Sequence, residues 1–348
     1  MNILRSAFAW PSAFSLGDLR PVILGARVLL RGLDLFCGAG GSSRGAKMAG
    51  VTLIAAVDVW DLAEATYADN FPETRFYKGS SESLQPLAIK RQIGNVDILL
   101  ASPECTSHTC AKGSAKRSER SRDTAMQVIR FAAVFKPKWI VVENVVYMRS
   151  WKRYGLWLSK LSRLGYHCRQ QVLNATDFGV AQSRKRLFVM CSRESMPELV
   201  VPTSPKWLSA RQVIDPNGKY SFTELRTRRR AKATLERADR ALENIGKTEP
   251  FLLVYYGSDG AGGWQKISKP LRTITTVDRF AYVRPAGHGG WEMRMLQVPE
   301  LQNAMGFPAD HKFRHGTRRD RIKLLGNAVC PPVMEAVIRS LQNLRPEA

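Results

Sequence analysis

The chain has 348 residues, 44% of them hydrophobic and 24% charged, which is ordinary for a globular protein with more than one hydrophobic core. Its formal net charge is +23, from 53 Lys and Arg against 30 Asp and Glu. This charge indicates a polyanionic partner, for which nucleic acid is the first candidate; the alternative is a generally basic, solvated surface. No apolar run approaches the ~20 residues that cross a bilayer, and the six cysteines lack C-x-x-C pairing, so we expect no membrane span, zinc site or disulfide framework.

Predicted strands and helices alternate through the first half of the chain. Residues 1–27, interrupted by Pro11 and by charges, form an N-terminal extension, for which a targeting peptide is a weakly signalled alternative. Two apolar runs, 28–36 and 51–57, then flank a glycine-rich turn and a helical segment at 42–49, which is a βαβ opening. The segments that follow are helix 62–71, strand 96–101, helix 124–135, strand 139–142, helix 154–164 and strand 187–191. This alternation predicts a parallel sheet covered on both faces.

The composition changes after residue 195, where we expect a second domain to begin. Prolines at 197, 202, 205 and 216 are followed by the basic run 226–232. Between residues 206 and 247, eleven Lys and Arg stand against five Asp and Glu. A helical pattern at 231–245 fits either a solvated amphipathic helix or one that faces nucleic acid. The end of the chain has two prolines followed by apolar residues at helical spacing. This pattern predicts a helix over 331–344 that packs back against the rest of the protein.

A glycine-rich loop follows the first predicted strand. LDLFCGAGG, residues 33–41, runs from a buried strand into Gly38, Gly40 and Gly41 before a helix. Glycines at such a turn let the backbone approach a ligand and place the N-terminal amides of a helix beside it. Asp58 ends the next strand about twenty residues on, where a carboxylate can accept hydrogen bonds from ribose hydroxyls. A nicotinamide dinucleotide is one alternative ligand, although the spacing G-x-G-G differs from G-x-G-x-x-G.

Reactive side chains follow other predicted strands. Cys105 comes just after strand 96–101, at the end where doubly wound sheets build their sites, and is a candidate nucleophile or, alternatively, a small buried hydrophobe. Glu143 follows four apolar residues, and an apolar wall can raise the pKa of a carboxyl so that it donates a proton; a helix cap is the alternative. Arg184 and Arg186 alternate and therefore point to one face, which seldom serves packing alone.

Taken in order, these segments resemble the motifs of the C5-cytosine DNA methyltransferase family. They are LDLFCGAGG, the acidic residue of AAVDVW, the SPxC segment, ENV, Q-S-R-K-R, MRMLQVPELQNAMGFP and GNAV. They span residues 33–335, and ENV followed by Q-x-R-x-R and GNAV at these separations is highly specific. The resemblance implies an α/β fold with the Rossmann-like, doubly wound, mostly parallel sheet of class I methyltransferases. It also implies three parts: an N-terminal extension at 1–27, a catalytic and cofactor-binding domain at 28–195 plus 322–348, and a smaller target-recognition domain at 196–321.

The resemblance also implies a role for each matching residue. Cys105 becomes the nucleophile, Glu143 the group that engages cytosine N3, Arg184 a donor that orients the substrate, and Arg186 a brace of the site. The cofactor is S-adenosyl-L-methionine, converted to S-adenosyl-L-homocysteine, and no metal is expected. The expected cofactor-binding residues are Phe36, Gly38, Ala39, Gly40, Gly41, Asp58, Val59, Ser80, Asn327 and Ala328.

Two positions depart from the family pattern. Glu104 precedes Cys105 where the family usually has proline, and a neighbouring carboxylate tends to raise the pKa of a thiol. Arg184, Lys112 or Lys116 are candidates to supply compensating positive charge. The segment YKGSSES offers Ser80 where the family commonly has an aspartate that contacts the adenine amino group, so adenine recognition by that position is in doubt.

The implied function is methyl transfer to carbon 5 of a cytosine flipped out of duplex DNA, through a covalent cysteine adduct. Residues 111–123 carry five basic side chains against two acidic ones and fit a loop that closes over the flipped base; an ordinary exposed loop is the alternative. We expect duplex DNA and a cognate restriction endonuclease as partners. We also expect no membrane association, a monomer, and the cytoplasm of a bacterial cell or phage-infected host.

Two other functions are weighed against this one. A cytosine methyltransferase that acts on RNA shares the fold, but the long basic segment and the absence of a Cys-Phe-Thr signature favour DNA. A non-catalytic DNA-binding protein that retains the fold is motivated by Glu104. The joint presence of Cys105, Glu143 and Arg184 favours the enzyme.

Overall fold

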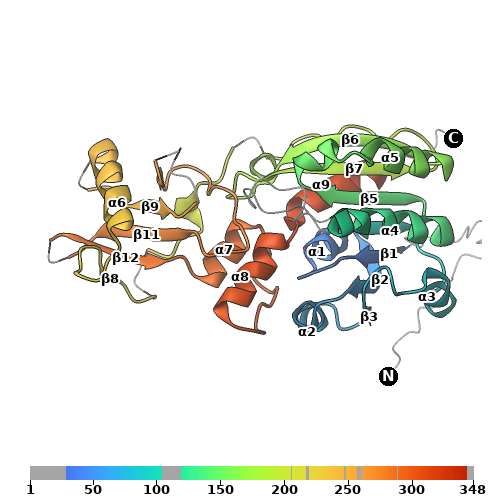
Figure 1. Ribbon diagram of the computed structural model, residues 1–348, viewed down its shortest axis with the longest axis horizontal. Coiled ribbons are helices and arrows are strands. Elements are labelled where there is room, and N and C mark those ends of the chain that lie inside the picture. Colours follow the sequence, from blue (N-terminus) through green and yellow to red (C-terminus); the bar gives the residue numbers. More distant parts are fainter. Residues whose placement is uncertain are drawn as a thin grey trace, which may run out of the picture.

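The computed structural model describes residues 29–103 and 119–342, except 205, 217–218, 247, 257–259, 261 and 288, and gives the backbone alone for 119–123. The N-terminal extension and Cys105 therefore lie outside the described residues. Two lobes lie side by side, one built on a seven-stranded sheet and the other on a five-stranded sheet (Figure 1). Helices α7 (Val298–Ala304) and α8 (Arg318–Asn327) lie between them (Figure 1).

The larger sheet has the strand order β3-β2-β1-β4-β5-β7-β6. Its strands are β1 (Leu30–Leu35), β2 (Val51–Asp58), β3 (Arg75–Lys78), β4 (Ile98–Ala101), β5 (Trp139–Asn144), β6 (His167–Asn174) and β7 (Lys185–Ser192). The first five run parallel, and β7 is antiparallel to both β5 and β6. The predicted fold class, a Rossmann-like and mostly parallel sheet, is confirmed.

Helices cover both faces of this sheet, which explains why its central strands read as unbroken apolar runs. They are α1 (Gly41–Met48), α2 (Asp61–Asn70), α3 (Pro86–Ile93), α4 (Glu119–Phe135), α5 (Tyr154–Arg163) and α9 (Pro331–Gln342). In β4, Ile98 and Leu100 belong to the core shared with α1 and α9. The alternate residues Leu99 and Ala101 belong to the core shared with α3, α4 and α5. Helix α9 packs against α1, so the end of the chain returns to the first lobe as predicted.

Several segments differ from the sequence prediction. Strands β3 and β6 and helix α3 were not predicted. The two strands form the edges of the sheet and have few buried apolar residues. Helix α4 begins at Glu119 and not at 124, so the last part of the predicted basic loop is helical. Cys168 and Cys191 lie opposite each other on β6 and β7 as free thiols, with their Sγ atoms 3.0 Å apart.

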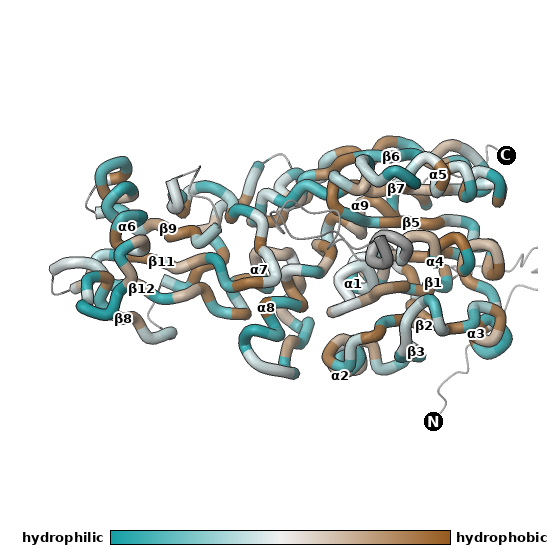
Figure 2. The backbone as a smooth tube through the Cα atoms, viewed as in Figure 1, coloured by the Kyte–Doolittle hydropathy of each residue, from teal (hydrophilic) through white to brown (hydrophobic). Residues whose placement is uncertain are grey.

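The smaller lobe is an antiparallel sheet of order β10-β9-β11-β12-β8. Its elements are β8 (Thr223–Glu224), β9 (Phe251–Val254), β10 (Trp264–Lys266), β11 (Phe280–Pro285), β12 (Trp291–Met295) and helix α6 (Lys232–Ile245). Ala238 and Ala241 of α6 pack on one face of the sheet, and the other face joins the main core through side chains such as Phe280 and Tyr282. Hydrophobic residues are prominent along strands such as β5 and β9, whereas hydrophilic ones gather around β8 (Figure 2).

Short 3-10 helices complete the described secondary structure at Val146–Ser150, Ala175–Phe178 and Ala210–Gln212. Across the described residues, none of the helices is long and apolar enough to cross a bilayer. The described residues also contain no group of three or more His, Cys, Asp or Glu side chains arranged to hold a metal ion.

Candidate active site and cofactor cavity

A cavity of about 800 Å³ opens where β1, β2, β3 and β4 end, a volume typical of small-molecule sites. All the predicted cofactor residues line it except Gly40, which lies within the same loop. These lining residues are Phe36, Gly38, Ala39, Gly41, Asp58, Val59, Ser80, Asn327 and Ala328. The tertiary structure thus gathers segments separated by more than two hundred residues around one space.

Close packing explains the glycines of the loop between β1 and α1. Gly38 and Gly40 have φ values of 51° and 78°, in the left-handed region that favours glycine. A Cβ on Gly40 would lie 2.5 Å from the Phe71 ring, and one on Gly41 would lie 2.3 Å from the carbonyl oxygen of Val329. A Cβ on Gly38, by contrast, would meet no heavy atom within 4 Å, so glycine leaves open space at the cavity wall.

Asp58 accepts hydrogen bonds from three backbone amides, one of them in this loop. One carboxylate oxygen accepts from Gly38 N at 2.8 Å, and the other accepts from Val59 N and Trp60 N at 2.8 and 3.0 Å. Burial raises the pKa of Asp58, and the three amide hydrogen bonds oppose that rise. The carboxylate that the sequence assigns to a ribose is therefore also a structural acceptor.

A buried polar cluster lies under the same loop. Asp34 of β1 is fully buried and accepts a hydrogen bond from Ser43 Oγ at 2.6 Å, and this hydroxyl lies 2.7 Å from Tyr67 Oη. Burial raises the pKa of Asp34 to about 7, with a smaller contribution from the charge of Asp58. Asp34 is not on the cavity wall, so it supports the loop from below.

His311 braces the loop from the side. Arg44 Nε donates to His311 Nδ1 at 3.2 Å, which leaves His311 Nε2 to donate to the carbonyl oxygen of Ala39 at 3.0 Å. Burial and the neighbouring charge of Arg44 lower the pKa of His311 to about 4, so the ring is neutral at pH 7. Sequence reasoning missed this residue, because an isolated histidine 267 positions after Arg44 carries no local signal.

The cavity wall contains further side chains that the sequence did not single out. Trp60 lies beside Lys323, whose Nζ is 4.6 Å from the indole centroid, and both line the cavity. Glu82 and Thr124 line it as well. Trp60 lies two positions after Asp58, so the sequence could have indicated it, whereas Lys323 and Thr124 approach the cavity only through the fold.

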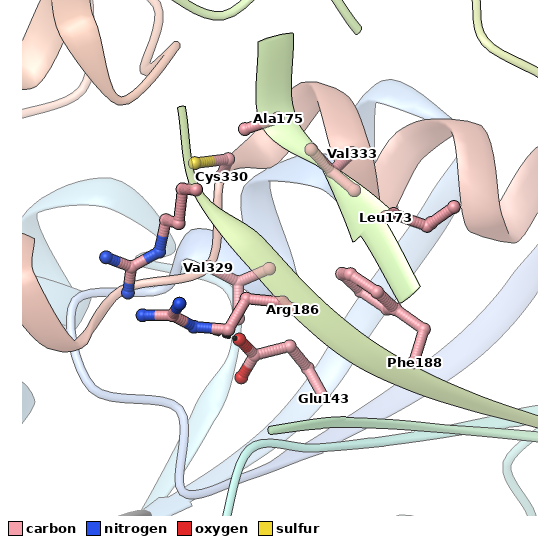
Figure 3. A pocket seen from close by; sticks show the side chains of 9 residues that line it. Glu143, Leu173, Ala175, Arg186, Phe188, Val329, Cys330 and Val333 are labelled. Atoms are coloured by element: carbon pink, nitrogen blue, oxygen red, sulfur yellow. Dashed lines mark ion pairs between the residues drawn. The ribbon is translucent and has the colours of Figure 1, made fainter. Parts of the chain in front are cut away.

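Glu143 lies at the end of β5 in a second, much smaller space. The residue is 6% exposed, and its Oε1 lies 3.2 Å from Arg186 Nε in an ion pair. Figure 3 shows the Glu143 carboxylate directed toward the Arg186 guanidinium, with Val329 and Cys330 nearby. Burial raises the pKa of Glu143, while the positive charges of Arg186 and then Arg184 lower it. A buried carboxyl with a raised pKa is suited to proton donation.

The two arginines have different partners in the structure. The guanidinium of Arg184, the residue expected to orient the substrate, donates to the backbone carbonyls of Ile274 at 2.9 Å, Gly326 at 2.8 Å and Ala328 at 3.1 Å. These contacts tie β7 to both lobes. Arg186 was expected to brace the site, and it is the residue that contacts Glu143. Side-chain alternation predicted that both lie near the site but could not distinguish their contacts, because Arg184 takes its partners from residues 274–328 and Arg186 pairs with Glu143 on β5.

The segment before the predicted nucleophile is tied to β5. Asn144 Nδ2 donates to the carbonyl oxygen of Pro103 at 3.0 Å, and Pro103 lines the large cavity. Val329 lines both the large cavity and the small space beside Glu143. The predicted nucleophile Cys105 and its neighbour Glu104 lie outside the described residues, as do Lys112 and Lys116.

Comparison with known proteins gives matches across most of the chain. A family model described as C-5 cytosine-specific DNA methylase matches residues 30–343. The Type II methyltransferase M.XorII of Xanthomonas oryzae pv. oryzae is 31% identical, over 88% of this chain and 83% of that protein. The Type II methyltransferase M.DdeI of Desulfomicrobium norvegicum is 31% identical over 49% of this chain, which spans only 43% of that relative. A solved mutant of DNMT2 from Spodoptera frugiperda, 20% identical, has a similar fold with a TM-score of 0.66 over 90% of this chain and 99% of that one.

Proposed function

The chain belongs to the C-5 cytosine-specific DNA methylase family, and on that premise we propose that it transfers a methyl group from S-adenosyl-L-methionine to carbon 5 of cytosine in duplex DNA. One observation supports this most: the large cavity and the buried Glu143 adjoin, because Val329 lines both. Asn144, next to Glu143, also holds Pro103, and Cys105 follows Pro103 by two residues. The cavity proposed for the methyl donor, the proposed proton donor and the segment that ends at Pro103 therefore lie at the carboxyl ends of neighbouring parallel strands.

The cavity fits this cofactor. The N-terminus of α1 and the loop around Gly38 supply backbone amides and open space, and Asp58 offers carboxylate oxygens at the end of β2. Phe36, Ala39, Gly40, Gly41 and Val59 shape the loop side of the site, Ser80 the β3 side, and Asn327 and Ala328 the opposite wall. When bound, the cofactor supplies an electrophilic sulfonium methyl group and leaves as S-adenosyl-L-homocysteine.

The residues of the chain make the cytosine ring reactive. The Cys105 thiolate adds to carbon 6, and Glu143, whose pKa is raised by burial, donates a proton to N3, so that carbon 5 becomes nucleophilic. Loss of the carbon 5 proton after methyl transfer expels the cysteine. Arg186 limits the rise in the Glu143 pKa through its charge, and Arg184 holds the two lobes in register around this site. The target base is flipped out of the duplex at a cost of roughly a few kcal/mol.

The remaining assignments follow from the same proposal. Residues 28–195 with 322–348 form the catalytic and cofactor-binding domain, and residues 196–321 recognise the target, with the basic surface of the chain holding phosphates. The protein acts as a monomer in the cytoplasm of a bacterial cell or phage-infected host. It protects DNA from a cognate restriction endonuclease, as the Type II names of its relatives suggest.

A trapping experiment tests the central step. Duplex DNA with 5-fluorocytosine in the target cytosine, incubated with the full chain and cofactor, should give a complex that survives denaturing electrophoresis. Cys105→Ala should lose this complex, whereas Cys168→Ala, which changes a free cysteine on β6, should keep it. Normal trapping by Cys105→Ala would overturn the role of Cys105.

The alternatives have distinct outcomes. Faster methyl transfer to tRNA than to duplex DNA would change the substrate class to RNA. DNA binding without transfer to any duplex, in the presence of cofactor, would support a non-catalytic protein. DNA affinity should fall steeply between low and moderate salt, because Lys and Arg release counterions from phosphates, and a flat response would contradict the nucleic-acid substrate.

A further inference from the structure

Two cysteines of the larger lobe face each other on neighbouring strands, and the function proposed above uses neither. Cys168 of β6 and Cys191 of β7 are directly opposite in the antiparallel register, and both are free thiols. Their side chains lie on the same face of the sheet, in the core shared with α4 and α5. Because 23 positions separate them, a search for C-x-x-C pairs in the sequence did not indicate this pair.

The backbone geometry at this pair suits a disulfide. Directly opposite residues on antiparallel strands have Cα atoms about 4.5–5.5 Å apart, which falls within the range of about 4.4–6.8 Å for disulfide-bonded cysteines. The two Sγ atoms are 3.0 Å apart and are joined by a hydrogen bond. A covalent bond between them therefore requires a small movement of the side chains and no change of strand register.

The two thiols differ in exposure, which gives each of them a distinct part in a reaction. Cys168 is half-buried on β6, which forms one edge of the sheet (Figure 1), whereas Cys191 is fully buried in the core. The hydrogen bond with Cys191 lowers the pKa of Cys168, and burial raises the pKa of Cys191. Because the thiolate is the nucleophile in thiol–disulfide exchange, Cys168 is the thiol that reacts first with a small reagent.

We propose that Cys168 and Cys191 form a modification site, which a low-molecular-weight disulfide such as oxidised glutathione converts into a cross-strand disulfide. The Cys168 thiolate attacks one sulfur of the reagent, forms a mixed disulfide and releases one thiol, which takes up the Cys168 proton. The Cys191 sulfur then attacks Cys168 Sγ, and the second thiol leaves with the Cys191 proton. Overall, two protein thiols lose two electrons, and the reagent is reduced to two thiols. This proposal does not depend on the methyl transfer proposed above.

The disulfide closes a loop that contains both arginines of the substrate site. Residues 168–191 include Arg184 and Arg186, and Cys191 lies five positions along β7 from Arg186, or about 17 Å. A crosslink stabilises a fold chiefly by restricting the unfolded chain, so the folded geometry near Arg186 should change little. The pair therefore locks the edge strand β6 to β7 under oxidising conditions and does not switch the reaction off.

Oxidation of the full chain tests this proposal. Cys105→Ala serves as the background, because it removes the proposed nucleophile as a competing thiol. After incubation with oxidised glutathione, mass spectrometry should show that the chain has lost two hydrogen atoms and that one peptide pair is joined through Cys168 and Cys191. The melting temperature should rise by about 3–10 °C relative to the reduced chain and should return to its original value after treatment with dithiothreitol.

Two further variants in the same background serve as controls. Cys168→Ala should lose both the crosslink and the difference in melting temperature between oxidised and reduced protein, whatever its own stability. Cys110→Ser, which changes a cysteine outside the pair, should retain both. The proposal would be overturned if Cys168 and Cys191 stayed as free thiols or if the reaction stopped at a mixed disulfide on Cys168. A crosslink that left the melting temperature unchanged or lowered it would also overturn the proposed lock.

Discussion

The cofactor half of the site, at the ends of β1, β2 and β3, differs in construction from the substrate half, at the ends of β5 and β7. The cofactor half is built mainly from one stretch of chain, residues 33–82, and its polar contacts are mostly backbone amides and carbonyls. The substrate half joins Glu143, Arg186 and Val329 from three distant stretches and contains an ion pair between the buried Glu143 and the half-buried Arg186. A local loop can shape a ligand cradle, whereas buried charges must be balanced by residues that only the fold brings together.

The largest effect is expected from a substitution in the substrate half that lowers the rate of methyl transfer and leaves binding in the cofactor half unchanged. Glu143→Gln removes the carboxyl proton donor but keeps the size of the side chain, so methyl transfer should fall by about 10²-fold to 10⁴-fold. S-Adenosyl-L-homocysteine should still bind within about 2-fold of the original affinity, because Glu143 does not line the large cavity. Single-turnover transfer and calorimetric binding measure the two quantities. An equal loss of both would show that the halves are not independent.

The next largest effect is a loss of stability that should differ between Arg184 and Arg186. Arg184→Met leaves three backbone carbonyls without their donor, so the free energy of unfolding should fall by about 2–4 kcal/mol in urea. Arg186→Met changes a more exposed residue and should cost less stability. It removes the positive charge that lowers the Glu143 pKa most, so that pKa should rise.

The pH profile gives the sign of the Arg186 effect. If transfer requires protonated Glu143, activity falls as pH rises through its pKa, and a higher pKa in Arg186→Met moves this limb to higher pH. Single-turnover rates at a series of pH values measure the limb. A shift toward lower pH would contradict the assignment of Glu143 as the acid, and a larger stability loss in Arg186→Met than in Arg184→Met would contradict the assignment of the brace.

The smallest expected effect concerns Asp34, the buried carboxyl that supports the loop of the cofactor half, and the pH dependence of the free energy of unfolding. Asp34 keeps its proton in the folded protein up to a pKa of about 7, compared with 3.8 as its ordinary value. Between these values the folded state binds more protons than the unfolded state, so Asp34 makes the free energy of unfolding decrease as pH rises from about 4 to 7. In Asp34→Asn this decrease should be smaller, by about 1–3 kcal/mol across the window. Urea unfolding at pH 4.5 and 7.5 measures it, and an equal or steeper decrease in the variant would contradict the buried, protonated carboxyl.

Local sequence patterns predicted most of the strands and helices of the larger lobe and few of those of the smaller lobe. The strands around Leu33, Leu99 and Val141 are buried on both faces, so their apolar runs were recognisable. Strand β6 is largely exposed or half-buried, and β8 and β10 contain only two and three residues, so none has a periodic signal long enough to read. The antiparallel direction of β7 was equally hidden, because direction depends on how the chain crosses the sheet.

The sequence by itself determined the family, the mostly parallel fold and the stretches that form the site, because glycines, strand-end carboxylates and their separations are local or ordinal features of the chain. Only the tertiary structure decided how these residues divide their roles. Arg184 donates to the carbonyls of Ile274, Gly326 and Ala328, Asp58 accepts from Gly38 in the loop after β1, and Glu82 lines the cavity. The physical reason is that a buried polar side chain acts through its hydrogen-bond partners, and for Arg184 those partners lie up to 144 positions away.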